Sequence, residues 1–101
     1  MGFNKLVRDK IPEIIKSQGE EAIIRVLEVN EYIQYLEKKL DEEVAEYDES
    51  KDIEELADIL EVVFALAEAE SHSKNELFSI YKTKNEKRGG FSNRMFLISK
   101  R

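Results

Sequence analysis

The residues most able to do chemistry in this chain are concentrated in one acidic stretch. Residues 41–61 contain eleven Asp and Glu side chains and one basic side chain, that of Lys51. Carboxylate oxygens are the ligands that Mg²⁺ and Mn²⁺ prefer, and such a cation would convert the repulsion among clustered carboxylates into binding. The competing interpretation is that these side chains form the solvated faces of two helices that meet at a turn.

The direction in which each side chain leaves its helix distinguishes candidate metal ligands from solvent-facing residues better than spacing along the sequence does. Acidic pairs three positions apart are common here, so spacing alone selects none of them. On a first helix, Glu43 and Glu46 lie at the edge of the apolar stripe, whereas Glu42 points towards water. On a second helix, Glu55 and Asp58 lie on the apolar side. A short turn would bring these two pairs of carboxylates together.

A carboxylate that approaches a packed interface needs a partner, because desolvation otherwise raises its pKa and neutralises it. A divalent cation is one such partner for Glu43. Lys39, one helical turn earlier, is the other. The sequence leaves both open at this point.

Hydrophobic periodicity predicts the two long helices that would position these carboxylates. Apolar residues recur at the three-and-four spacing of one helical face between residues 33 and 47, and Asn30 can cap that helix. The polar turn "DESKD" ends it. Asp52 with Glu55 then forms a variant of the capping box that opens a second helix, which runs to about Ser71. This second helix is apolar on most sides, so we expect it to be the most buried element.

Shorter elements flank this pair. Pro12 favours a short helix over residues 12–18, closed by Gly19. Residues 22–27, "AIIRVL", are rich in β-branched side chains and are typical of a short strand or an extended segment.

A third helix is expected in the last third of the chain. Ser73 and Glu76 form a capping box at its start, and "RGG" supplies glycine for its end. The whole pattern predicts an all-α fold in a single domain over residues 1–101. We expect an antiparallel helical hairpin plus a third helix, with short extended segments at the termini.

Composition excludes several classes of protein. The chain has no cysteine and one histidine, His72, which excludes thiolate and His-rich zinc sites. A formal net charge of −6 argues against generic nucleic-acid binding. Because no signal-peptide core and no apolar run of bilayer length is present, we expect a cytoplasmic protein.

Four segments resemble one enzyme family. "LDEEVAEY" followed by "IEELADILEVVFAL" is similar to the paired metal-binding helices, EExxE and then ExxD, of the MazG-type all-α nucleoside triphosphate pyrophosphohydrolases. "NKLVRDKIPEII" and "KNEKRGGF" resemble the flanking segments of a small single-domain branch of that superfamily, described as phosphoribosyl-ATP pyrophosphohydrolase-like.

This resemblance implies a site, a reaction and an assembly. Four carboxylates would hold Mg²⁺, or alternatively Mn²⁺, with a supporting role for Glu42 behind them: Glu43, Glu46, Glu55 and Asp58. The implied reaction is hydrolysis of a non-canonical or surplus nucleoside triphosphate to the monophosphate and pyrophosphate by metal-activated water, so that no Ser, Cys or His nucleophile is needed. The implied assembly is a homodimer or homotetramer.

Basic residues near both ends of the chain are candidates for binding the phosphates. They are Lys5, Arg8, Lys84, Lys87 and Arg88. The alternative for each is an ordinary role in surface solubility. Gly89 and Gly90 fit the end of a helix better than a phosphate-binding loop, because the pattern is not that of a P-loop.

Two other functions stay open. The first is the phosphoribosyl-ATP pyrophosphohydrolase of histidine synthesis. Two features argue against it. The histidine enzymes lack the "KLVRDKIP" opening, and they carry a Tyr-His pair where this chain has Glu61 and Val62. The second is a non-catalytic helical dimerisation or interaction module. The apolar side of residues 53–67 exceeds what one further helix covers, which indicates burial against another subunit.

Overall fold

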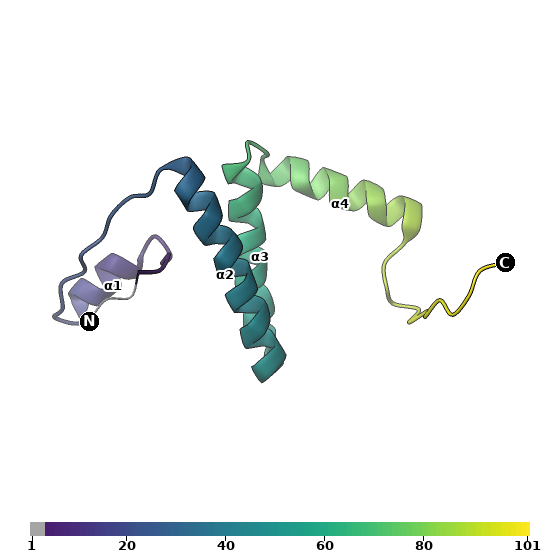
Figure 1. The fold of residues 1–101 in the computed structure, drawn as a ribbon, viewed down its shortest axis with the longest axis horizontal. Coiled ribbons are helices and arrows are strands. Elements are labelled where there is room, and N and C mark those ends of the chain that lie inside the picture. The colour runs from purple at the N-terminus through teal and green to yellow at the C-terminus, as the bar shows by residue number, and fades with distance from the viewer. Residues whose placement is uncertain (1–3) are drawn as a thin grey trace.

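The described part of the chain, residues 4–101 of a computed structural model, consists of four helices and contains no strand. The helices are α1 (Ile11–Ser17), α2 (Val29–Ser50), α3 (Ile53–Ala69) and α4 (Lys74–Arg88) (Figure 1). The all-α prediction is therefore confirmed, whereas the strand considered for residues 22–27 is absent. None of these helices is long and apolar enough to cross a membrane.

Helices α2 and α3 lie side by side and run in opposite directions (Figure 1). Two residues, Lys51 and Asp52, reverse the chain between them. Lys51 adopts the left-handed conformation at φ 57°, and its amide donates to the carbonyl of Tyr47 at 2.8 Å. This bond satisfies one of the carbonyls left without a partner at the end of α2. The reversal is tight enough for residues within about two turns on either side to face each other.

The predicted cap of α2 is wrong, and the predicted cap of α3 is right in position but not in its hydrogen bonds. Helix α2 begins one residue before Asn30, and its cap position is occupied by Glu28, whose side chain makes no capping bond. Asp52 does precede α3, but its side chain caps nothing. The Asp52 amide donates to Ser50 Oγ at 3.1 Å, so the donor that Glu55 would take in a capping box is already used.

Half of the predicted capping box of α4 is confirmed. Ser73 Oγ accepts a hydrogen bond from the Glu76 amide at 3.0 Å. The Glu76 carboxylate does not return to the Ser73 amide, because it lies 2.8 Å from Nδ1 of His72. At the other end of α4, Gly89 has a φ of +78°, a conformation in which glycine is favoured, and the helix ends there as expected.

Helix α4 contacts α3 near its first turns and then leads away from the α2–α3 pair (Figure 1). The contact includes the rings of Phe64 and Phe78, whose centroids are 5.5 Å apart. Beyond the end of α4 the chain turns sharply before it runs on to the C-terminus, and this segment lies on the opposite side of the α2–α3 pair from α1 (Figure 1).

The single chain has very little core. Among residues 4–101, the buried apolar side chains are Leu36 on α2 and Val62 on α3. Helix α3 has the largest share of buried and half-buried positions, as expected, yet Ile53 and Leu60 on it are 73% and 50% exposed. The radius of gyration is 17.9 Å, against about 13 Å for a compact domain of this length. The fold therefore leaves much of its apolar surface in contact with solvent.

Candidate metal centre

Glu43 is the buried charged residue of the described chain, and one of its oxygens is unsatisfied. Its side chain is 8% exposed. Oε1 lies 3.4 Å from Nζ of Lys39, at the long end of the range for an ion pair. Oε2 is buried and has no hydrogen-bond partner among the described residues. A buried oxygen in this state costs free energy, so it needs an explanation.

The explanation lies across the hairpin, where two further carboxylates approach Glu43. Glu43, Glu55 and Asp58 each offer an oxygen, and these three atoms all lie within 4.8 Å of one another. Glu43 comes about two turns before the reversal at Lys51, and the two residues of α3 come within two turns after it. Glu55 and Asp58 are three positions apart, so they share one face of α3.

The pKa of two members of the cluster is raised, in each case first by desolvation. Burial is the main reason why the pKa of Glu43 lies above its ordinary value. The hydrogen bond from Lys39 opposes this rise in pKa, and the side chain of Glu46 adds to it through hydrogen bonding and through its charge. The pKa of Glu55 is also raised, first by desolvation and then by the negative charges of Glu46 and Asp58. Desolvation and neighbouring carboxylates therefore both disfavour the charged forms of Glu43 and Glu55.

Glu46 and Glu42 differ in how close they come to this cluster. Glu46 is exposed on α2, lies outside the group of three oxygens, and still acts electrostatically on both Glu43 and Glu55. It therefore lies at the rim of the cluster. Glu42 is exposed, as its helical direction indicated.

Arg8 already supplies part of the missing positive charge. Its Nη2 lies 2.7 Å from Oδ1 of Asp58, and the two side chains are 60% and 40% exposed. The segment before α1 thus reaches α3, fifty positions away along the chain. Arg8 was predicted to bind phosphate. Its ion pair with Asp58 was not predicted, because no local pattern joins these two residues.

The other predicted phosphate ligands do not all lie near the carboxylates. Lys5 is exposed in the segment before α1. Lys84, Lys87 and Arg88 are exposed in the last turns of α4, the end that points away from the α2–α3 pair (Figure 1). Within one chain, these three cations are separated from Glu43 and its neighbours.

The cluster suits a hard divalent cation. All three side chains present oxygen, and the unsatisfied Oε2 of Glu43 is the kind of buried atom that an ion would satisfy. Three carboxylates also leave coordination positions for water or phosphate, which Mg²⁺ usually keeps.

Comparisons with known proteins add little to this geometry. No protein-family model matches the chain, and no solved structure matches it significantly. An uncharacterised protein of Mycolicibacterium smegmatis is 55% identical over 42 residues, which make up 42% of this chain and 43% of that protein. The chain thus matches less than half the length of this relative.

Proposed function

We propose that this chain is a Mg²⁺- or Mn²⁺-dependent nucleoside triphosphate pyrophosphohydrolase with the all-α pyrophosphohydrolase fold, in which the α2–α3 hairpin carries the metal site and α4 is the third helix. The observation that carries this proposal is the buried, unsatisfied Oε2 of Glu43 beside the carboxylates of Glu55 and Asp58. The resemblance of the two acidic segments to EExxE and ExxD helices supports the choice of reaction.

Three ways of stabilising Glu43 can be compared. Lys39 reaches one oxygen at 3.4 Å and leaves the other without a partner. Protonation is favoured by the raised pKa of Glu43, but it would leave the charges of Glu55 and Asp58 close together. A divalent cation attracts all three carboxylates at once and neutralises two of their three negative charges, and it also explains why carboxylates from two helices converge.

In this proposal the described residues have distinct roles. Glu43, Glu55 and Asp58 hold the cation, and Glu46 at the rim adds negative charge that strengthens its binding. A cation bound there would neutralise charge on the phosphate oxygens and lower the pKa of a water molecule that attacks phosphorus. Glu42, one position before Glu43 and exposed, is not needed as a ligand.

Arg8 and the basic end of α4 would meet the remaining phosphate charge. The guanidinium of Arg8 is 60% exposed and lies beside the cluster, so it can turn from Asp58 to a bound phosphate. Lys84, Lys87 and Arg88 lie too far from the carboxylates of their own chain, so we assign them to the site of a second subunit in a homodimer or homotetramer.

The proposal is tested with a panel of nucleoside triphosphates in the presence of Mg²⁺ or Mn²⁺, monitored separately for pyrophosphate and orthophosphate. We expect pyrophosphate as the product. Glu55→Gln should reduce its release by about two or more orders of magnitude, since charge neutralisation and water activation fail together. Glu54→Gln is the matched control, because Glu54 is the adjacent exposed glutamate on α3 and should retain activity. Orthophosphate as the product, or equal activity in the two variants, would contradict the proposal.

The assignment of α4 to a neighbouring site has its own test. Glu55→Gln and a variant in which Lys84, Lys87 and Arg88 are all replaced by alanine should each be inactive alone, because each removes a different half of every site. If the halves come from different subunits, mixing and re-equilibrating equal amounts should restore about a quarter of wild-type activity, since half of the dimers are mixed and one of their two sites is intact. No recovery on mixing would place both halves in the same chain.

A further inference from the structure

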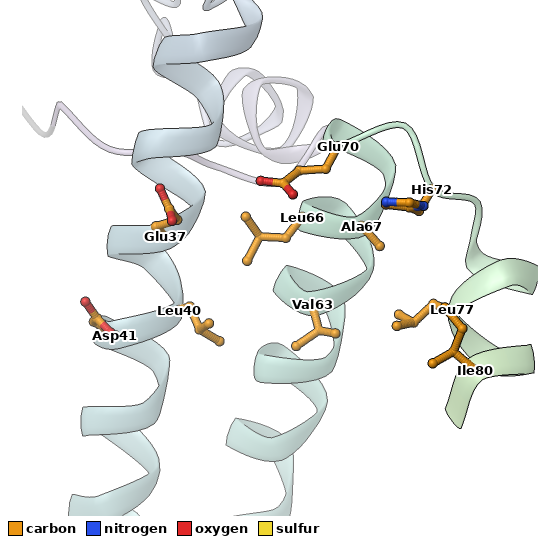
Figure 2. Close-up of a pocket in the computed structure, with 10 residues that line it drawn as sticks. All are labelled: Glu37, Leu40, Asp41, Val63, Leu66, Ala67, Glu70, His72, Leu77 and Ile80. Carbon is orange, nitrogen blue, oxygen red and sulfur yellow. The ribbon is translucent and has the colours of Figure 1, made fainter. Parts of the chain in front are cut away.

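Helices α2, α3 and α4 enclose a groove on the molecule that the proposed metal site does not use. Its volume is about 620 Å³. Figure 2 shows the apolar side chains that line it, with those of α4 directed towards α3 across the gap. They are Leu40, Val63, Leu66, Ala67, Leu77 and Ile80. A cavity of this size and lining is large enough to accept several apolar side chains.

The border of this groove is acidic. Glu37 and Asp41 project from α2 on one side, and Glu70 lies at the end of α3 near the turn into α4 (Figure 2). Any segment that fills the groove would therefore gain from carrying positive charge next to its apolar residues.

The C-terminal segment, residues 91–101, has this combination of properties. Five of its large apolar side chains are 80–95% exposed: Phe91, Met95, Phe96, Leu97 and Ile98. Its ionisable side chains are all basic, Arg94, Lys100 and Arg101, and it has no Asp or Glu. A segment with so many exposed apolar side chains is expected to be covered in the stable form of the protein.

We propose that residues 91–101 of a second copy of this chain occupy the groove. The apolar residues of the segment would pack on Leu40, Leu66 and Ile80, and its cations would face the acidic border. Reciprocal exchange of the two segments closes a twofold dimer, because each copy has one groove and one segment.

Two observations favour a second copy over the same chain as the source of this segment. Residues 81–90 separate the segment from Ile80, the last groove residue on α4, and the end of α4 carries the segment away from α2 and α3 (Figure 1). The described chain also buries only Leu36 and Val62 among its apolar residues and has a radius of gyration well above that of a compact domain. Packing against a second copy covers this surface. The proposal does not depend on the metal site.

Cysteine cross-linking tests the proposal directly, since the natural chain has no cysteine that could interfere. Ala67→Cys places a thiol in the groove, and Ser99→Cys places one in the segment with almost no change of size. One of the two variants is labelled with ¹⁵N. Mixing and oxidation should give a disulfide-linked dimer of one labelled and one unlabelled chain, identified by mass spectrometry.

The matched control replaces Ala67→Cys with Ser17→Cys, an exposed position at the end of α1 outside the groove. It should form at least about tenfold less of the mixed dimer under the same conditions. Equal yields from both pairs would overturn the proposal. So would a double variant, Ala67→Cys with Ser99→Cys, that closes its disulfide only within one chain at every protein concentration.

The oligomeric state supplies a second readout that needs no engineered thiol. Phe96→Asp puts a charge into the apolar part of the segment and should weaken the dimer at least about tenfold in analytical ultracentrifugation. Val26→Asp is the control, because Val26 and Phe96 are both 88% exposed in the chain but Val26 lies outside the segment and the groove. A wild-type monomer at micromolar concentration, or equal weakening by the two substitutions, would overturn the proposal.

Discussion

Replacement of Glu43 by glutamine should stabilise the metal-free protein and abolish its response to Mg²⁺. The glutamate is buried, one of its oxygens has no partner in the described chain, and two other carboxylates lie beside it. Glu43→Gln keeps the size of the side chain, removes the negative charge, and provides an amide N–H that can donate to a neighbouring carboxylate.

The magnitude follows from the burial of this one group. A buried polar group without a partner costs about 1–3 kcal/mol. Lys39 compensates part of this through Oε1, so we expect the free energy of unfolding to rise by about 1–2 kcal/mol in EDTA at neutral pH. For a chain of this length, each kcal/mol corresponds to about 4–8 °C in Tm.

Mg²⁺ should reverse this order of stability. At a Mg²⁺ concentration about one hundred times its Kd, the wild-type protein gains about 2.7 kcal/mol by mass action, whereas the variant gains almost nothing. The assay is thermal unfolding by circular dichroism, with and without Mg²⁺, at one fixed protein concentration because assembly also affects Tm.

Glu42→Gln is the control for this experiment. It makes the same change of charge one position earlier, on an exposed side chain, and should respond to Mg²⁺ as the wild type does. The reasoning is refuted if Glu43→Gln lowers stability in EDTA, or if both variants respond equally to Mg²⁺.

Three further predictions concern pH, the Arg8 ion pair and the cap of α4. The folded-state pKa of Glu43 lies above its ordinary value of 4.5, so the folded state binds this proton more tightly than the unfolded state does. The Tm of the metal-free protein should therefore fall as pH rises from about 4.5 through the raised pKa. Melting curves at a series of pH values test this, and saturating Mg²⁺ should flatten the dependence. Arg8→Ala removes a cation from Asp58 and should tighten Mg²⁺ binding about two- to fivefold by calorimetry, as expected for loss of a competing exposed ion pair; unchanged or weaker binding would contradict this. Ser73→Ala removes the hydrogen bond to the Glu76 amide and should cost about 1 kcal/mol in urea unfolding, and an unchanged midpoint would show that this cap does not stabilise the fold.

The convergence of the central carboxylates could be predicted from the sequence because it depends on local rules. Helical periodicity placed Glu43 and Glu46 at the edge of the apolar stripe of one helix and Glu55 and Asp58 on the apolar side of the next, and a short turn fixed their approach. Three of these four carboxylates lie together, whereas Glu46 is exposed at the rim of the cluster. The same rules separated exposed Glu42 from its neighbour. The all-α class followed from the same periodicity.

Features that depend on competition between groups could not be predicted in this way. The Asp52 capping box failed because Ser50, two positions earlier, takes the amide that Glu55 would need. The capping box of α4 formed only one of its two hydrogen bonds, because the Glu76 carboxylate pairs with His72 instead of the Ser73 amide. Several partners with similar energies were available in each case, and the sequence alone does not rank them.

Long-range contacts were also beyond local rules. The ion pair of Arg8 with Asp58 joins residues fifty positions apart. Helix α4, which contacts α3 through Phe78 and Phe64, leads away from the α2–α3 pair and so separates Arg88 from the carboxylates of its own chain. Both are tertiary arrangements that no local motif encodes.

The central claim, that Glu43, Glu55 and Asp58 form a site for a divalent cation, is tested most directly by titration of the metal-free protein with Mn²⁺. Electron paramagnetic resonance measures the free Mn²⁺ that remains at each point. We expect saturable binding that Mg²⁺ competes away, that Glu43→Gln abolishes, and that Glu42→Gln leaves intact. Equal binding by all three proteins, or no saturable binding by the wild type, would contradict the claim.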